Sequence, residues 1–322
     1  MVIFAFRLET ANSQKKMNEK ELPPHLREDN LSEETKTLIS SLPWNKDFIG
    51  NLYKYKGCWY YPNTLQGVLN FEKGFKPQET DIILASFPKS GTTWLKALTI
   101  ALFERLKNIP FFEFNLYLKS STPDLTKFSS PRVFSTHMPF HTLRLTLKDS
   151  PCKIVYVCRN VKDVFVSLWY FRCAHLEKEV DMKSLFKSLC EGVGSFGPFW
   201  EHVLSYWRGS LEDPKKVLFM RYEEMKSEPS AQVKRLAEFL GCPFTEEEEE
   251  DGSVDKIVEL CSLRNLSGME VNNSGKTFNT VPYFTFFRKG EVGDFKNHLT
   301  PEMENKIDMI IEEKYKGSGL KF

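Results

Sequence analysis

The segment Asp81-Ile-Ile-Leu-Ala-Ser-Phe-Pro-Lys-Ser-Gly-Thr-Thr-Trp94 runs from an apolar stretch through a small polar loop into a helix-forming region. Its first part, up to residue 87, is a short apolar run typical of a parallel strand buried on both faces. From Trp94 to Leu106, apolar residues recur at three- and four-residue spacing, which predicts a helix with an apolar face. We therefore expect a strand, a loop and a helix in direct succession.

Apolar runs and helical spacings repeat along the rest of the chain. We expect further strands at residues 132–135, 153–158 and 216–220, and helices at residues 161–175 and 229–240. Strands that alternate with helices predict a mostly parallel sheet covered on both faces. No internal repeat or change of composition marks a second domain. We therefore expect a single α/β domain with a central sheet flanked by helices.

Composition limits the function classes open to this chain of 322 residues. With 41% hydrophobic and 27% charged residues it falls in the globular range, which excludes a disordered, collagenous or coiled-coil chain. The 44 basic and 43 acidic residues give a formal net charge of +1. Such a balance does not indicate a broad nucleic-acid surface, so any anion site must be local and no nucleic-acid partner is expected.

The domain limits and the cellular location follow from simpler signals. The N-terminal region is polar and contains the breaker pair Pro23-Pro24, so we expect a poorly ordered arm at residues 1–40 and one domain at residues 41–322. The apolar run at residues 2–6 is too short for a signal-peptide core, and no apolar run is long enough to span a bilayer. Seven scattered cysteines without a C-x-x-C pair fit a reducing compartment. We expect a cytoplasmic protein that does not associate with membranes.

The loop between the first strand and its helix has the chemistry of a phosphate cradle. Gly91 lets the backbone approach a ligand closely, and the N–H groups at the start of the helix favour an anion. Thr92 and Thr93 add hydroxyl donors, and Lys89 supplies a positive charge. The alternative is an ordinary turn in which Ser90 or a threonine only caps the helix. The combination of these residue types favours a phosphate loop like that of the P-loop kinases.

A nucleoside-triphosphate kinase needs a different loop, however. Its pattern is G-x-x-x-x-G-K-[ST], with a hydroxyl and a strand-end aspartate holding Mg²⁺. Here the loop has one glycine, its lysine precedes that glycine, and Arg159 follows the strand at residues 153–158. A sulfuryl group carries less negative charge than a phosphoryl group, so cations and backbone dipoles can neutralise its transfer without a metal. We expect an anionic donor and no metal; a metal-dependent kinase is the alternative, which an activity assay with and without Mg²⁺ distinguishes.

The same loop, Phe87-Pro-Lys-Ser-Gly-Thr-Thr-Trp94, resembles the 5′-phosphosulfate loop of the cytosolic sulfotransferases, which use 3′-phosphoadenosine 5′-phosphosulfate (PAPS). The resemblance extends from about residue 44 to the C-terminus and is strongest to the plant members. It implies an enzyme that moves the sulfuryl group of PAPS to a hydroxyl of a small aromatic or steroid-like acceptor. The other segments that agree in order and spacing are Thr136-His137, Cys158-Arg-Asn-Val-Lys-Asp-Val-Phe-Val-Ser167, Met220-Arg-Tyr-Glu-Glu224 and Phe287-Arg-Lys-Gly290 with Glu291-Val-Gly-Asp-Phe295.

The resemblance implies two catalytic residues. Lys89 would bind the oxygen between phosphate and sulfate and stabilise the leaving group, a role that its place in the loop also suggests. His137 would be the general base, and it follows a predicted strand at the end where open α/β sheets place ligands. An unperturbed imidazole pKa of about 6.5 suits proton acceptance at neutral pH. Many animal members carry a lysine where this chain has Ser135, and the other histidines receive no role.

The resemblance also implies a set of nucleotide-binding residues. Arg159, Ser167 and the Arg288-Lys289-Gly290 segment resemble the ligands of the 3′-phosphate, and Trp94 and Tyr222 resemble the residues that contact adenine. Taken on their own, Arg159 can equally pair with Asp163, the 288–290 segment can be a solvated turn, and the aromatics can be core. The full predicted set is Lys89, Ser90, Gly91, Thr92, Thr93, Trp94, Arg159, Ser167, Tyr222, Arg288, Lys289 and Gly290.

The acceptor site and the oligomeric state have weaker signals. Phe111, Phe140 and the aromatics at residues 44–61 can line a cavity for a phenol, flavonoid or steroid-like alcohol, or they can be core. Residues 296–305 occupy the place of a dimer motif of animal members, K-x-x-x-T-V-x-x-x-E, but proline follows the threonine and Asn305 replaces the acid. We expect a monomer or weak dimer. A nucleotide-binding protein without catalysis is the alternative function.

Overall fold

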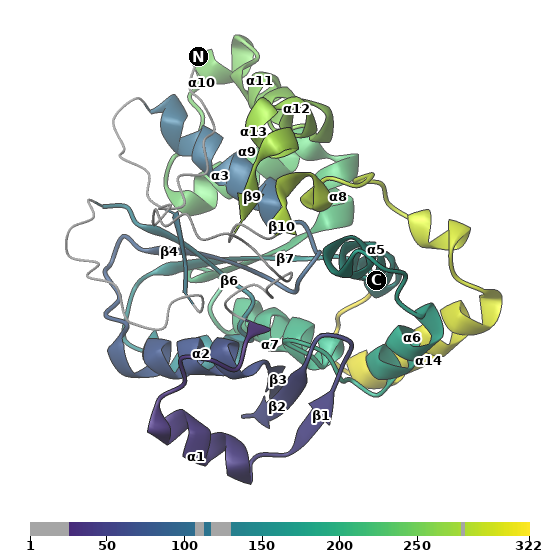
Figure 1. The fold of residues 1–322 in the computed structure, drawn as a ribbon. Helices are drawn as coiled ribbons and strands as arrows, with labels where there is room; N and C mark the ends of the chain where they lie inside the picture. The colour runs from purple at the N-terminus through teal and green to yellow at the C-terminus, as the bar shows by residue number, and fades with distance from the viewer. Residues whose placement is uncertain (1–25, 107–112, 117–129, 278–280) are drawn as a thin grey trace.

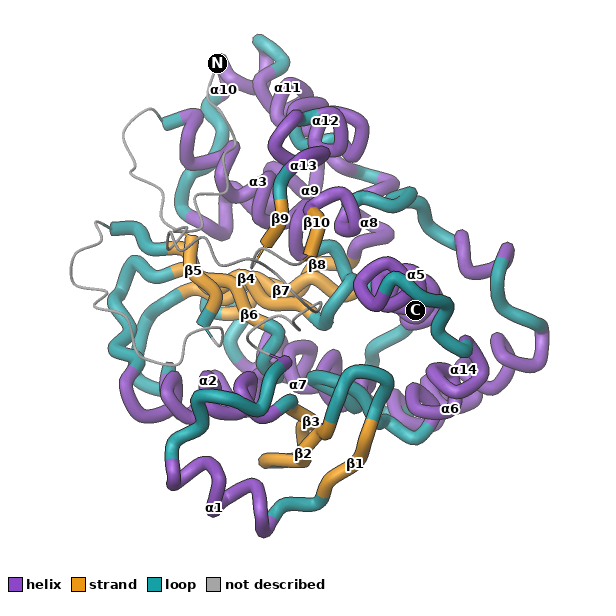
Figure 2. The backbone as a smooth tube through the Cα atoms, in the orientation of Figure 1, coloured by secondary structure: helices purple, strands orange, loops and turns teal. Residues whose placement is uncertain are grey.

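The computed structural model describes residues 26–106, 113–116, 130–277 and 281–322. Its centre is a sheet in the order β5-β6-β4-β7-β8, in which every neighbouring pair is parallel (Figures 1 and 2). The predicted strands are confirmed, with ends shifted by no more than a residue. The five strands are β4 (Ile82–Ser86), β5 (Glu113–Asn115), β6 (Val133–Thr136), β7 (Lys153–Cys158) and β8 (Val217–Arg221).

Both faces of the sheet are buried because alternate residues of each strand enter different hydrophobic clusters. Leu84 of β4 packs with α3 (Thr92–Arg105), α9 (Pro229–Leu240) and α11 (Ser253–Leu260). Its neighbours on β4 pack on the other face, with α2 (Pro62–Gly74), α5 (Val161–Leu176) and α7 (Phe199–Glu212). Figure 1 shows α3 and α9 above the sheet and α2 and α7 below it. An apolar run such as 82–85 therefore forms a central strand.

The sheet register brings the ends of β4, β6, β7 and β8 to one edge. Ala85 pairs with Thr136 of β6 and with Tyr156 of β7, and Cys158 pairs with Arg221 of β8. The chain passes from one side of β4 to the other between β6 and β7. In open α/β sheets, ligands bind outside the carboxyl ends of the strands at such a reversal.

A buried ion pair joins β4 and β6 at their opposite, amino ends. Arg132 donates to both carboxylate oxygens of Asp81, from Nε at 2.7 Å and from Nη2 at 2.6 Å. Both side chains are buried. Asp81 also accepts a hydrogen bond from the backbone N–H of Gln78, and Arg132 donates to the carbonyl of Lys76. The pair is therefore well satisfied, as a buried charge must be.

The N-terminal part of the described chain forms a small layer under α2 and α7. Helix α1 (Glu33–Ser41) precedes an antiparallel sheet of β1 (Trp44–Lys46), β2 (Asn51–Tyr55) and β3 (Cys58–Tyr60). Residues 33–40 are thus helical, and the part of the predicted arm at residues 1–25 lies outside the described residues. Of the aromatics at 44–61, those from residue 59 to 61 are core, whereas Trp44 is 66% exposed.

The remaining elements lie mainly on the flanks of the sheet. Thr245 caps α10 (Glu246–Glu250) through a capping box, as its position before an acidic run suggests. Within the part of the chain that the structure describes, no helix is long and apolar enough to cross a membrane. These elements are α4 (Phe140–Thr146), α6 (Met182–Cys190), α8 (Tyr222–Ser227), α10 (Glu246–Glu250), α12 (Leu263–Gly268), α13 (Glu270–Ser274), α14 (Pro301–Tyr315), β9 (Lys276–Thr277), β10 (Val281–Pro282), η3 (Tyr283–Phe286) and η4 (Asp294–Asn297).

Candidate active site

Four of the parallel strands end next to residues predicted to be functional. The loop with Lys89 follows β4, His137 follows β6, Arg159 follows β7 and Tyr222 follows β8. The sheet register therefore gathers residues from four separate segments at one edge. A fifth segment, residues 287–295, joins them through the contacts described below.

Gly91 gives the loop after β4 its shape for two independent reasons. It caps α3 with a φ of 111°, in the left-handed region that favours glycine. A Cβ atom at this position would also lie 2.8 Å from Cδ2 of Tyr222. Any larger residue would therefore strain the loop and push against the Tyr222 ring. Lys89, two residues earlier, also has a positive φ of 70°.

Tyr222 connects the loop to the other parts of the site. Its hydroxyl donates to the carbonyl of Gly290 at 3.0 Å. Its ring meets Trp94 edge to face, with centroids 5.5 Å apart, and the Arg159 guanidinium lies 4.3 Å from its centroid. Burial raises the pKa of Tyr222, so the hydroxyl remains a donor at neutral pH. One buried ring thus contacts the predicted phosphate loop and the predicted 3′-phosphate residues.

Lys89 is half-buried in a positively charged environment. Its Nζ donates to the carbonyl of Thr285 at 3.4 Å and lies 4.4 Å from the ring centroid of Phe171. Burial lowers the pKa of Lys89 to about 7, and the positive charges of Arg159 and Arg288 contribute. The contribution of Arg159 and Arg288 to the lowered pKa shows that the three cations lie near one another. An anion placed there would favour the charged lysine.

Several hydrogen-bonding atoms around this space are buried and unsatisfied. Among the described residues, Ser90 Oγ, Trp94 Nε1, Arg159 Nε and Arg288 Nε have no hydrogen-bond partner. Buried polar groups in folded proteins are nearly always paired. All four atoms can donate, so they match a ligand that carries several acceptor oxygens or nitrogens.

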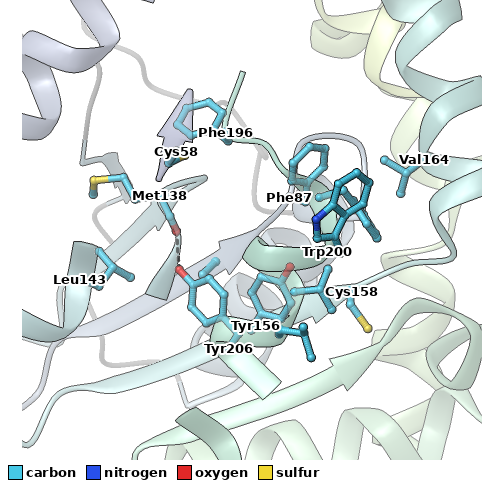
Figure 3. Close-up of a cluster of buried hydrophobic side chains, with 14 of the residues drawn as sticks. Cys58, Phe87, Met138, Leu143, Tyr156, Cys158, Val164, Phe196, Trp200 and Tyr206 are labelled. Atoms are coloured by element: carbon cyan, nitrogen blue, oxygen red, sulfur yellow. Dashed lines mark hydrogen bonds between the residues drawn. The ribbon is translucent and has the colours of Figure 1, made fainter. Parts of the chain in front are cut away.

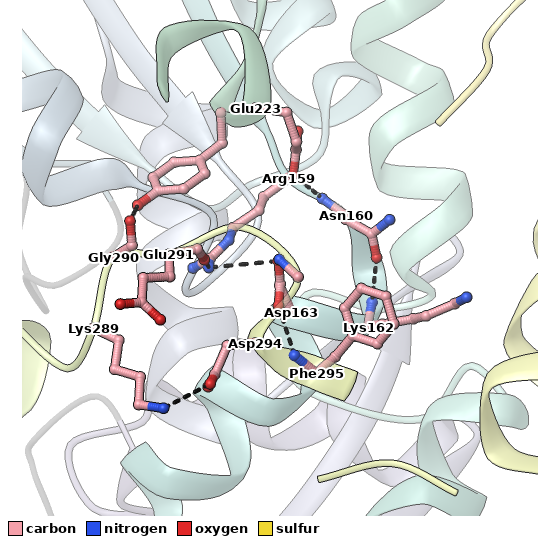
Figure 4. A network of polar contacts seen from close by, with 12 residues as sticks. Arg159, Asn160, Lys162, Asp163, Glu223, Lys289, Gly290, Glu291, Asp294 and Phe295 are labelled. Atoms are coloured by element: carbon pink, nitrogen blue, oxygen red, sulfur yellow. Dashed lines mark hydrogen bonds and ion pairs between the residues drawn. The ribbon is translucent and has the colours of Figure 1, made fainter. Parts of the chain in front are cut away.

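Asp294 pairs with the two basic residues of the 288–290 segment. Its carboxylate accepts from Arg288 at 2.5 Å, from Lys289 at 2.7 Å and from Asn297 at 3.0 Å (Figure 4 shows the Lys289 contact). His298 Nε2 lies 3.2 Å from the same carboxylate. Within the segment, Arg288 is mostly buried, whereas Lys289 stays exposed. A carboxylate holds its cations beside the site.

Asp163 anchors the same segment to the start of α5. Its carboxylate accepts backbone N–H bonds from Gly293 at 2.8 Å and from Phe295 at 3.1 Å (Figure 4 shows the Phe295 contact). Arg159 donates to the carbonyl of Glu291 at 2.6 Å, and its Nη2 lies 3.7 Å from Asp163. Arg159 thus makes the pair with Asp163 that its spacing allowed, and its buried Nε is left without a hydrogen-bond partner.

The ring of His137 is held in one orientation by a main-chain acceptor. Its Nδ1 lies 2.7 Å from the carbonyl oxygen of Ser86. A carbonyl can only accept, so Nδ1 carries the hydrogen and Nε2 is the basic nitrogen. Burial lowers the pKa of His137 to about 4; Lys96 and Lys89 lower it further, against the hydrogen bond to Ser86, which raises it. The imidazole is therefore neutral near pH 7, and its pKa lies below the ordinary value on which the sequence-based expectation rested.

The other predicted residues are placed less informatively. Thr92 Oγ1 lies 2.5 Å from Ser86 Oγ, and Thr93 is in the first turn of α3. Ser167 is buried on α5, about two turns from its start. Phe140 packs against Tyr206 of α7. Phe111 lies outside the described residues.

Sequence reasoning missed two polar residues that organise this edge, one buried and one half-buried. His202 of α7 contacts the main chain of His137, with Nε2 2.9 Å from the carbonyl oxygen. Glu223 accepts the backbone N–H of Asn160 at 2.9 Å and so joins the ends of β7 and β8. A lone histidine within a helix carries no local signal. Glu223 lies in the segment Met220-Arg-Tyr-Glu-Glu224, in which the sequence indicated a role for Tyr222 alone.

Comparison with known proteins decides the family. A family model described as the sulfotransferase domain matches residues 79–319. Cytosolic sulfotransferase 1 of Arabidopsis thaliana is 64% identical in an alignment 326 positions long that covers 94% of this chain and 98% of that protein. The chain belongs to the sulfotransferase family. It is thus a transferase enzyme, its similarity to plant members is confirmed, and the kinase alternative is set aside.

Solved sulfotransferases share the fold. A candidate steroid sulphotransferase from Arabidopsis thaliana has a TM-score of 0.69 and 38% identity, covering 91% of this chain and 98% of that one. Mouse sulfotransferase SULT7A1, solved with PAP, has a TM-score of 0.68 and 29% identity, covering 83% and 96%. The predicted α/β architecture with a P-loop-like phosphate loop is confirmed.

The contacts of Asp294 predict how stability depends on pH. Burial alone would raise the pKa of Asp294, but hydrogen bonds from Lys289, Arg288 and Asn297 outweigh it and hold the pKa well below its usual value. A depressed folded pKa stabilises the protein above the unfolded pKa of about 4, and this stabilisation is lost as the pH falls below it. Asp294→Asn should therefore lower the urea midpoint at pH 7, and by a somewhat smaller amount at pH 3, which lies between the unfolded and the folded pKa. Equal losses at both pH values, or an equal loss in the exposed control Asp149→Asn, would contradict the assignment.

Proposed function

We propose that this sulfotransferase moves the sulfuryl group of PAPS to a hydroxyl of a small aromatic or steroid-like acceptor in the cytosol. The observation that carries the proposal is the position of His137, a neutral base fixed at the same strand edge as the phosphate loop. The names of relatives support the location and the acceptor class, and the PAP bound to mouse SULT7A1 supports the donor.

The donor would be held by the residues whose polar atoms lack partners. The loop at residues 89–93 would bind the 5′-phosphosulfate with backbone N–H groups and hydroxyls. Arg159 and Arg288, with Ser167 and Lys289, would bind the 3′-phosphate. The unpaired Nε atoms of the two arginines suit phosphate oxygens, because arginine contacts to phosphate are strong and directional. Trp94 and Tyr222 would contact the adenine ring. PAPS, when bound, supplies the activated sulfuryl group.

The proposed reaction needs one proton transfer and one charge stabilisation. His137 Nε2 accepts the proton of the acceptor hydroxyl while that oxygen forms a bond to sulfur. The bond from sulfur to the bridging oxygen breaks, and Lys89 stabilises the negative charge on the departing phosphate. The carbonyl of Ser86, which accepts from Nδ1, stabilises the imidazolium as it forms. No metal is needed in this scheme.

The surroundings of His137 favour an apolar, aromatic acceptor. The ring of Phe196 meets the imidazole edge to face with centroids 5.5 Å apart, and Tyr60 meets Phe196 in turn at 5.8 Å. Phe171, which lies beside Lys89, adds another aromatic surface. Such rings pack well on flat hydrocarbon frameworks with one hydroxyl.

We propose that the enzyme works as a monomer or weak dimer.

Replacing the base should abolish turnover and leave nucleotide binding intact. His137→Ala is expected to lower kcat by about 10² to 10⁴-fold, the usual worth of a general base. The affinity for adenosine 3′,5′-bisphosphate, measured by calorimetry, should be unchanged. His141→Ala is the matched control, because that exposed histidine is close in sequence but contacts only the carbonyl of Lys56 among the contacts described. Near-normal kcat in His137→Ala would refute the role.

Nucleotide binding should draw a proton onto Lys89. With a pKa of about 7, roughly nine in ten Lys89 side chains are uncharged at pH 8, and a bound anion raises that pKa. Calorimetry with adenosine 3′,5′-bisphosphate in buffers of different ionisation enthalpy should therefore show uptake approaching one proton. Lys89→Arg keeps the charge but does not titrate there, so its uptake should be much smaller. Equal uptake in both proteins would contradict the prediction.

A further inference from the structure

A buried hydrogen-bonded chain lies behind the main chain of His137. Tyr156 is in the middle of β7 and His202 is in the first turn of α7, and both are essentially fully buried. The hydroxyl of Tyr156 lies 3.0 Å from Nδ1 of His202, and Nε2 of His202 lies 2.9 Å from the carbonyl oxygen of His137. The proposed reaction gives neither residue a role.

The direction of every bond in this chain is set by its last acceptor. The carbonyl of His137 can only accept, so Nε2 of His202 must carry the hydrogen. Nδ1 of His202 is then the acceptor, and the hydroxyl of Tyr156 must donate to it. Burial lowers the pKa of His202 to about 3, so this arrangement persists in one protonation state at neutral pH.

We propose that His202, oriented by Tyr156, is a positioning residue that fixes the main chain of His137 and so keeps the imidazole aligned. His137 is then held at both ends, by Ser86 at the ring and by His202 at the carbonyl. The inference rests on the proposed role of His137 as the base. A base must meet its proton within a narrow geometry, and small displacements are costly in rate.

The chain offers a matched control for this contact. Tyr206, also on α7, donates to the carbonyl of Met138 at 2.6 Å, and its ring stacks on Tyr156 with centroids 4.0 Å apart (Figure 3). It binds the carbonyl next to that of His137. Tyr206→Phe and Tyr156→Phe each remove one buried hydroxyl from the same stacked pair and keep the ring, but only the second removes a hydrogen bond to His202.

Two substitutions at residue 202 separate positioning from packing. The amide nitrogen of glutamine reaches about as far as Nε2 of histidine, whereas the amide of the shorter asparagine stays near the position of Nδ1. His202→Gln therefore keeps a donor for the His137 carbonyl, and His202→Asn loses it. Both are neutral and polar, so a difference between them reports the contact.

The experiment combines kinetics, binding and spectroscopy on the full-length enzyme. His202→Asn should lower kcat by about 10- to 100-fold, with the Kd for adenosine 3′,5′-bisphosphate unchanged. His202→Gln should recover most of kcat. In ¹⁵N-histidine NMR spectra, the wild type and His202→Gln should show His137 as a fixed Nδ1–H tautomer, and His202→Asn should show a mixture.

Defined outcomes would overturn the inference. It fails if His202→Asn keeps the wild-type kcat and the fixed tautomer, or if both variants lose kcat and nucleotide affinity equally. If His202→Asn does not fold, Tyr156→Phe must lower kcat more than Tyr206→Phe, and equal effects refute the inference. The tautomer of His137 is read without turnover, so failure of the positioning role is distinguished from failure of His137 as the base.

Discussion

The parallel pairing of β4 with β6 and β7 is the constraint on which the site depends. Because each pair runs in the same direction, the loops that follow these strands emerge at one edge. The pairing places the carbonyl of Ser86, at the end of β4, where the ring after β6 can donate to it. A register slip of one residue would break that contact and turn every side chain of the strand to the opposite face.

Charge at this edge is arranged in two different ways. Asp294 holds Arg288 and Lys289 through short hydrogen bonds, so these cations are compensated inside the protein. Lys89 lies near aromatic rings and a carbonyl, and burial lowers its pKa to about 7, so it is only partly protonated at neutral pH. The site therefore becomes fully charged only when an anion enters. Burial has a different use at His137, where it keeps a proton-accepting group neutral.

The parts of this site that could be predicted are those with signals within a few residues. The apolar run of β4, the small residues after it and the periodic helix α3 lie in one segment, and strand ends located His137 and Arg159. The roles of Asp163 and His202 could not be predicted in this way. His202 acts on a carbonyl 65 positions away, and Asp163 binds an N–H group 130 positions away. Only the packed fold creates those contacts.

The central claim is that this edge binds a 3′-phosphorylated adenine nucleotide without a metal. The most direct measurement is a thermal-shift titration with adenosine 3′,5′-bisphosphate in EDTA, compared with ATP and Mg²⁺. At about a hundredfold excess over Kd, binding stabilises the folded state by about 2.7 kcal/mol, so Tm should rise clearly with the bisphosphate alone. A rise with Mg²⁺ and ATP, and none with the bisphosphate, would contradict it.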